Sequence, residues 1–151
     1  MSEELIEKIK KEVKEFFSKL GFEVEVEILQ REGFFKVNAQ TKEFQDLIGE
    51  KGKTLLEIQH LLNAILKKKM GGEIFIDLDI AGYKERKIKY LKELAKSVAD
   101  EVALTKKEKI LEPMPAYERR IIHLELASRP DVTTESIGKE PKRRVVIKPY
   151  P

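Results

Sequence analysis

The sequence predicts an α+β protein built from two small domains, residues 1–80 and residues 81–151. Two observations predict this organisation. Apolar residues recur at helical spacing in several stretches, whereas residues 22–28 and 73–80 alternate between apolar and mainly acidic side chains, as half-buried strands do. Charge also separates the two parts, since residues 1–80 carry 13 basic and 16 acidic side chains and residues 81–151 carry 17 and 11. The second part is therefore expected to face a polyanion.

The first domain is predicted to begin with a helix and a β-hairpin. Apolar residues lie three or four positions apart over residues 5–20, and Gly21 stops the helix. Strands over residues 22–28 and 34–39 are joined by a turn at residues 31–33. The glutamates of the first strand make one face of this hairpin acidic, so a nucleic acid is expected on another face.

Two helical patterns then meet at Gly49-Glu50-Lys51-Gly52. Glycines at both ends of a loop allow its backbone to approach a ligand closely. The helix that opens after Gly52 would aim free N–H groups and the positive end of its dipole at that ligand, which suits phosphate. A third strand is predicted over residues 73–80. The inner stripe of the long helix is predicted to be Leu55, Ile58, Leu62 and Ile65.

From residue 81 the sequence becomes more basic without a flexible linker. A helix is predicted from Gly82, with one apolar face and a basic remainder that indicates either a phosphate-facing flank or a solvated surface. A short strand over residues 109–112 and a helix over residues 116–128, opened by Pro115, follow. The basic side chains of the first helix are Lys84, Arg86, Lys87, Lys89, Lys92 and Lys96.

The helix over residues 116–128 contains an Arg-x-x-x-His pattern. Arg119 and His123 are four positions apart, so they share one face of the helix. Together they are able to grip one phosphate, the arginine with its planar fork and the histidine with a ring N–H. The pattern indicates a second anion-binding site.

The order helix, strand, strand, helix, loop, helix, strand, together with LIGEKGKTLLEIQHLLNAIL, resembles the prokaryotic (type II, α-β-β-α-α-β) K-homology, or KH, RNA-binding domain. The G-x-x-G loop of a KH domain clamps the backbone of about four nucleotides. The resemblance covers residues 1–80 and implies that Gly49 and Gly52 admit the nucleic-acid backbone while Lys51 and Lys53 supply charge. Glu50 departs from the basic pair often found between the glycines, so its charge should weaken phosphate contact.

The runs PMPAYERRIIH and SIGKEPKRRVVIKP look like the small nucleic-acid-binding domain named after its Arg-x-x-x-His signature. In that family the helix lies against a three-stranded antiparallel sheet, for which residues 132–137 and 143–148 are the remaining strands, joined by a turn at residues 138–142. The resemblance implies a site for single-stranded nucleic acid. Its expected contact residues are Arg119, Arg120, His123, Lys139, Lys142, Arg143 and Arg144.

The pairing of these two motifs resembles the Jag family of cytoplasmic bacterial RNA-binding proteins. It implies a binder of single-stranded RNA, or of single-stranded DNA, that acts in post-transcriptional control and forms a homodimer or a heterodimer with a small single-KH protein. The loop is expected to position the strand and the second domain to hold phosphates. No cofactor, metal or membrane partner is expected, because the sequence has no Cys, two His and no long apolar run. Functions tied to the further N-terminal domain of the family are not expected here.

Two other functional classes stay open. His123 and Arg119 are suitable as the general base and the phosphate clamp of a phosphodiesterase, although no cysteine nucleophile or specific acidic metal set accompanies them. Alternatively, the KH domain serves as a protein-interaction scaffold through its helices or strand edges, with His60 at the surface or in an interface.

Overall fold

The computed structural model describes residues 2–151 and divides the chain into two compact units. Unit 1 comprises Met1–Glu85 and unit 2 comprises Arg86–Pro151. Each unit combines helices with a three-stranded sheet, which confirms the predicted α+β class.

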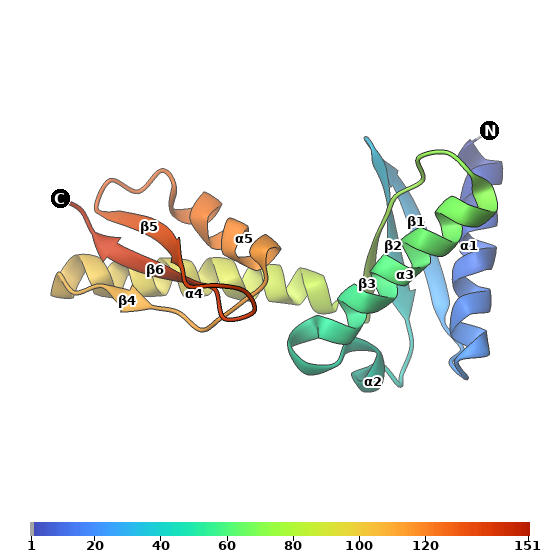
Figure 1. Ribbon diagram of the computed structural model, residues 1–151, viewed down its shortest axis with the longest axis horizontal. Helices are drawn as coiled ribbons and strands as arrows, with labels where there is room; N and C mark the ends of the chain where they lie inside the picture. Colours follow the sequence, from blue (N-terminus) through green and yellow to red (C-terminus); the bar gives the residue numbers. More distant parts are fainter. Residues whose placement is uncertain (1) are drawn as a thin grey trace. The chain divides into compact units, whose positions relative to one another are not determined.

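Unit 1 is a three-stranded sheet with its two long helices on one face. The strands lie in the order β1-β2-β3, and α1 and α3 contact the sheet and each other (Figure 1). The core between them is wholly aliphatic and aromatic, with Phe17, Leu62 and Leu78 among its most buried side chains. The elements are α1 (Ser2–Lys19), β1 (Glu25–Arg31), β2 (Phe34–Gln40), α2 (Gln45–Ile48), the 3₁₀ turn η1 (Glu50–Gly52), α3 (Lys53–Met70) and β3 (Ile76–Ile80).

The β1–β2 hairpin is tighter and starts later than the sequence predicts. Arg31 pairs with Phe34, which leaves a two-residue turn whose second residue, Gly33, has a φ of 85°. Residues 22–24 precede the strand because β2 ends at Gln40, the partner of Glu25, and gives them nothing to pair with. The predicted acidic face is present, with Glu25 and Glu27 exposed on the side of the sheet away from the helices.

β3 lies parallel to β2, and this pairing determines where the glycine loop lies. Parallel neighbours need a crossover, and residues 41–75 supply it with α2, the loop and α3. α3 buries one stripe against the sheet, but Leu66 occupies its last inner position and Ile65, predicted there, is only half-buried. Spacing of seven or eight residues after Ile58 fits either residue, and the packing selects Leu66.

Unit 2 packs two helices against an antiparallel sheet with the strand order β4-β6-β5. Leu91, Ala95 and Val102 of the first helix meet Ile122 of the second and Ile147 of the central strand in one core. Ile88, predicted to point inward, is only half-buried. The elements are α4 (Tyr83–Thr105), of which unit 2 takes the part from Arg86, β4 (Lys109–Ile110), α5 (Ala116–Leu126), β5 (Val132–Ile137) and β6 (Arg144–Pro149).

Candidate nucleic-acid interface

The loop between α2 and α3 has a backbone that turns through the left-handed region three times. The φ angles are 72° at Gly49, 54° at Lys51 and 79° at Gly52. Glycine adopts such angles at no steric cost, whereas a lysine in this region is strained. The loop therefore has a defined shape that its sequence makes possible at two of the three positions.

Both glycines are also required by the space around them. A Cβ atom on Gly49 would lie 2.1 Å from the hydroxyl oxygen of Thr54, and one on Gly52 would lie 2.7 Å from the ring of Tyr83. Gly52 is itself buried. The two glycines thus allow the loop to pack closely on its own unit, a structural requirement that is separate from the approach of a ligand backbone.

The side chains of the loop are free to face solvent. Glu50, Lys51 and Lys53 are exposed. α3 begins at Lys53 with Gly52 as its N-cap and, among the described residues, has no side chain capping its first turn. Backbone N–H groups at the start of a helix have no partner within the helix, and with two lysines beside them they suit an anion. Glu50 is the one opposing charge.

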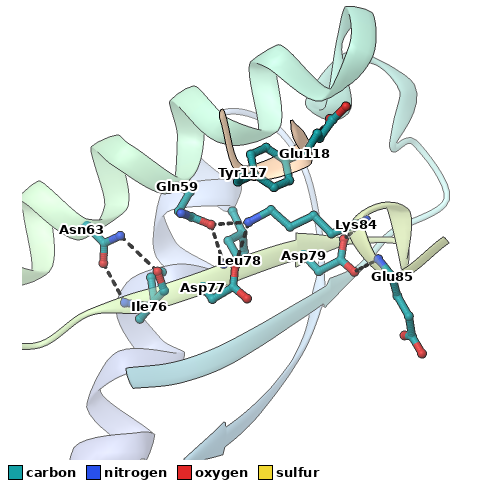
Figure 2. Close-up of polar contacts among 10 residues, drawn as sticks. All are labelled: Gln59, Asn63, Ile76, Asp77, Leu78, Asp79, Lys84, Glu85, Tyr117 and Glu118. Atoms are coloured by element: carbon teal, nitrogen blue, oxygen red, sulfur yellow. Dashed lines mark hydrogen bonds and ion pairs between the residues drawn. The ribbon is translucent and has the colours of Figure 1, made fainter. Parts of the chain in front are cut away.

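The outer edge of β3 is covered by two amide side chains of α3 (Figure 2). Asn63 accepts a hydrogen bond from the N–H of Ile76 at 2.8 Å and donates one to its carbonyl at 3.1 Å. The N–H of Leu78 donates to Gln59 Oε1 at 2.9 Å. These backbone groups at the sheet edge are therefore already bonded, and another strand cannot pair with them without displacing the amides.

Two further polar residues near β3 have roles that the sequence prediction missed. Lys84, predicted to lie on the basic flank of α4, is instead buried, and its Nζ pairs with Asp77 Oδ1 at 2.7 Å and with Gln59 Oε1 (Figure 2). The carboxylate of Asp79 accepts the backbone N–H of Lys84 at 2.8 Å and that of Glu85 at 3.3 Å. Asp79 thus caps the first turn of α4, where a negative charge is favourable.

In unit 2, His123 joins α5 to β5. Its ring nitrogens Nδ1 and Nε2 each lie 2.7 Å from a hydroxyl, that of Thr134 and that of Ser136 respectively. A hydroxyl both donates and accepts, so a neutral imidazole satisfies both contacts in either tautomer. Burial, and secondly the charge of Arg119, lower the pKa of His123 below its ordinary value and favour this neutral form.

Arg119 is also turned inward. Its Nη1 donates to the carbonyl of Met114 at 2.7 Å and pairs with Glu140 Oε1 at 2.8 Å. The predicted grip of one phosphate by Arg119 and His123 therefore does not appear in this structure, because each side chain has partners of its own. The shared helix face was foreseen, and the residues opposite it were not.

The remaining predicted contact residues of unit 2 lie in or near the turn between β5 and β6. Arg120, Lys139 and Lys142 are exposed, whereas Arg143 and Arg144 are half-buried. Arg143 Nη1 donates to the carbonyl of Gly138 at 2.7 Å, and Arg144 Nε donates to that of Lys142 at 3.2 Å. The structure thus brings Lys139, Lys142, Arg143 and Arg144 together on one turn, which we call the basic turn (residues 138–144).

Sequence signals existed for some of the missed residues. Thr134 and Ser136 are two apart on a strand whose neighbours at that spacing are core residues, so they were identifiable as polar side chains beneath the helix. Glu140 is the single acid in the run KEPKRR. Gln59 and Asn63 are four apart on one helix face, but nothing in the sequence indicates that they meet a strand edge.

Comparison with known proteins separates the two halves. Residues 89–149 match the domain family named after its Arg-x-x-x-His signature. The matched segment includes α5 with Arg119 and His123 and the whole basic turn.

The chain is also similar to bacterial proteins named RNA-binding protein KhpB. It is 38% identical over 128 residues to the protein from Clostridium symbiosum, covering 85% of this chain and 58% of that protein. Those from Lactiplantibacillus plantarum and Bacillus subtilis are each 36% identical, covering 85% and 67% of this chain and 40% and 50% of those proteins. The chain thus spans about half the length of the curated relatives it matches.

Two features are absent from the described part of the chain. Among residues 2–151, no group of three or more His, Asp or Glu side chains is arranged to hold a metal ion. None of the helices described here combines the length and apolarity needed to span a membrane.

Proposed function

We propose that this chain is a non-catalytic binder of single-stranded RNA related to the Jag proteins, with residues 1–80 as a type II KH domain and residues 81–151 as the Arg-x-x-x-His domain. We further propose that it acts in the cytoplasm, in post-transcriptional control. The observation that carries the proposal is the similarity to proteins named RNA-binding over 128 residues, which exceeds the length of unit 1 and so reaches both units.

The two units would make different contacts with the strand. In unit 1, the N-terminus of α3 with Lys51 and Lys53 offers a compact site for one or two phosphates, while Glu50 limits its affinity. In unit 2, Arg120, Lys139 and Lys142 offer exposed charges to the backbone. The loop would therefore position the strand and the basic turn would hold it.

Salt dependence of binding tests this proposal. Four to seven phosphate contacts at a single-strand slope of about −0.7 each predict that log affinity falls by roughly 3 to 5 per tenfold increase in salt. Fluorescence anisotropy with a labelled, unstructured oligoribonucleotide measures the slope, and a DNA oligonucleotide of the same sequence shows whether the 2′-hydroxyl matters. A slope near zero would exclude backbone contacts of this kind.

A phosphodiesterase is the competing catalytic class, and the structure disfavours it. Both ring nitrogens of His123 contact hydroxyls that fix α5 to β5, so the imidazole has a structural task. Incubation of labelled RNA with the protein, with and without divalent metal, decides between the classes. Cleavage that is lost in His123→Ala and kept in His60→Ala would replace our proposal.

Self-association is a second candidate role, favoured by one observation. The sheet face of unit 1 away from α1 and α3 exposes Leu29 (37%) and Phe75 (51%). A homodimer, or a heterodimer with a small single-KH protein, would cover this apolar surface. Light scattering of the wild type and of Phe75→Ser tests it, since a dimer that uses this face should dissociate in the variant.

A further inference from the structure

The ion pair between Arg119 and Glu140 joins an anchored side chain to an exposed one. The Arg119 side chain is 9% exposed and is held at the carbonyl of Met114, whereas the Glu140 side chain is 61% exposed and extends from the basic turn. A carboxylate that is so exposed exchanges readily with solvent and other anions. Glu140 is therefore the partner that leaves when the pair opens.

The position that Glu140 occupies suits a phosphate oxygen. Carboxylate and phosphate are both oxyanions that pair with the N–H groups of a guanidinium in similar geometry. On either side of Glu140 in the basic turn are Lys139 and Lys142, both exposed and linked by a hydrogen bond of 2.8 Å from the Lys142 N–H to the Lys139 carbonyl. A phosphate in place of the carboxylate would meet a guanidinium with two ammonium groups nearby.

We propose that Glu140 is a specificity-determining residue of unit 2, an internal carboxylate that closes the phosphate site of Arg119 to free anions and yields it to a nucleic-acid strand. The inference rests on the proposed function, because it concerns how the same surface selects its ligand.

The physical basis is effective concentration. Glu140 is tethered within reach of Arg119, and short tethers give effective concentrations in the millimolar range. A free phosphate ion competes with that tethered carboxylate from bulk solution and is at a disadvantage. A strand already held by Lys139 and Lys142 presents its next phosphate locally, so it competes on equal terms. The site therefore opens for polyanions and stays closed to single anions.

The first test is the exchange of one atom group, Glu140→Gln, with Glu135→Gln as the matched control. Glu135→Gln removes the same charge from the same unit, but Glu135 pairs with Lys148, at 3.0 Å, away from Arg119. Affinity for a labelled, unstructured oligoribonucleotide should rise roughly three- to tenfold in Glu140→Gln and less than twofold in the control. Thermal unfolding of both variants verifies that the fold is intact.

A second measurement addresses selectivity directly. Inorganic phosphate and chloride are compared as competitors at equal ionic strength. In the wild type the two salts should weaken RNA binding equally, whereas in Glu140→Gln phosphate should inhibit several-fold more strongly than chloride. In an Arg119→Lys background, which keeps the charge and loses the fork, the gain from Glu140→Gln should fall below twofold.

The outcomes distinguish the two proposals. Equal affinity and equal phosphate sensitivity in Glu140→Gln and Glu135→Gln would overturn the role of Glu140 and leave the proposed function standing. Failure of the wild type and both folded variants to bind RNA would overturn the proposed function and, with it, this inference. If Arg119→Lys does not fold, the phosphate comparison in Glu140→Gln still decides.

Discussion

The glycine loop of unit 1 and the Arg-x-x-x-His helix of unit 2 divide structural and contact roles in opposite ways. In the loop, the backbone at Gly49 and Gly52 is fixed by close packing, and Lys51 and Lys53 extend from it into solvent. In α5, the signature side chains are themselves the packed groups. A motif in a sequence therefore does not reveal which of its atoms hold the fold and which face the ligand.

This comparison can be broken most directly at Gly52. Gly52→Ala introduces a Cβ 2.7 Å from the Tyr83 ring at a φ of 79°, so backbone strain and overpacking add. We expect a loss of about 2–4 kcal/mol in the free energy of unfolding of unit 1, measured by urea denaturation. Gly21→Ala is the control, because Gly21 has a φ of 92° with nothing within 4 Å and should lose about 1–2 kcal/mol. Equal losses would refute the packing role.

His123→Ala should have the next largest effect. It removes two hydrogen bonds that join α5 to β5, and at about 1 kcal/mol each we expect a loss near 2 kcal/mol in the unfolding free energy of unit 2. His60→Ala, at an exposed position of α3, is the control and should change stability by less than about 0.5 kcal/mol. A stable His123→Ala that binds RNA poorly would return His123 to the role of a ligand contact.

The lowered pKa of His123 predicts a pH effect with a definite sign. Burial makes the folded protein bind the proton less readily than the unfolded chain, so the unfolded state gains protons first as pH falls. The stabilising contribution is complete above the ordinary pKa of about 6.5 and is lost as pH falls from there through the depressed value. Melts at about pH 7.5 and 5.5, on either side of that ordinary value, should show a larger decrease for the wild type than for His123→Ala.

Exposed cations of unit 2 should affect binding and leave the fold unchanged. Arg120→Gln and Lys142→Gln each remove one expected phosphate contact, so each should reduce the magnitude of the salt slope by about 0.7 and change stability by less than about 0.5 kcal/mol. Lys109→Gln, at a lysine that pairs with Glu101 at 2.9 Å, is the control for charge alone. An unchanged slope in both test variants would move the contact surface elsewhere.

The smallest effect is expected at Lys51. Asn tolerates left-handed φ better than Lys, so Lys51→Asn should stabilise unit 1 slightly, by a few tenths of a kcal/mol. Loss of the charge should weaken RNA binding roughly two- to threefold and reduce preference among oligonucleotide sequences. Lys8→Gln, on the exposed face of α1, controls for net charge. Unchanged affinity and preference would show that the loop does not touch the strand.

Periodicity predicted most of the elements because it reports which side of a helix or strand is buried. Leu55, Ile58 and Leu62 were assigned correctly on this basis, and β5 was found at the predicted residues. The same signal is indifferent between Ile65 and Leu66 at the end of α3, where the packing decides.

What periodicity cannot supply is the identity of the group on the other side. Arg119 was placed on the correct helix face, yet its contact with Glu140 depends on how the basic turn folds back, and no local pattern encodes that. Lys84 was assigned to the solvent because lysines usually are, but a partner on β3 and another on α3 compensate for its burial. Pairs distant in sequence are where sequence reasoning ended.

The amide side chains of Asn63 and Gln59 make α3 act as a substitute for a fourth strand. The amide protons of Ile76 and Leu78 should exchange slowly with deuterated solvent, as those of a central strand do, although β3 lies at the side of its sheet. Growth of the sheet by addition of a neighbouring chain is then confined to β1. There Glu25 and Glu27 would place like charges beside each other in a pairing of two copies, which disfavours fibrous or stacked assembly.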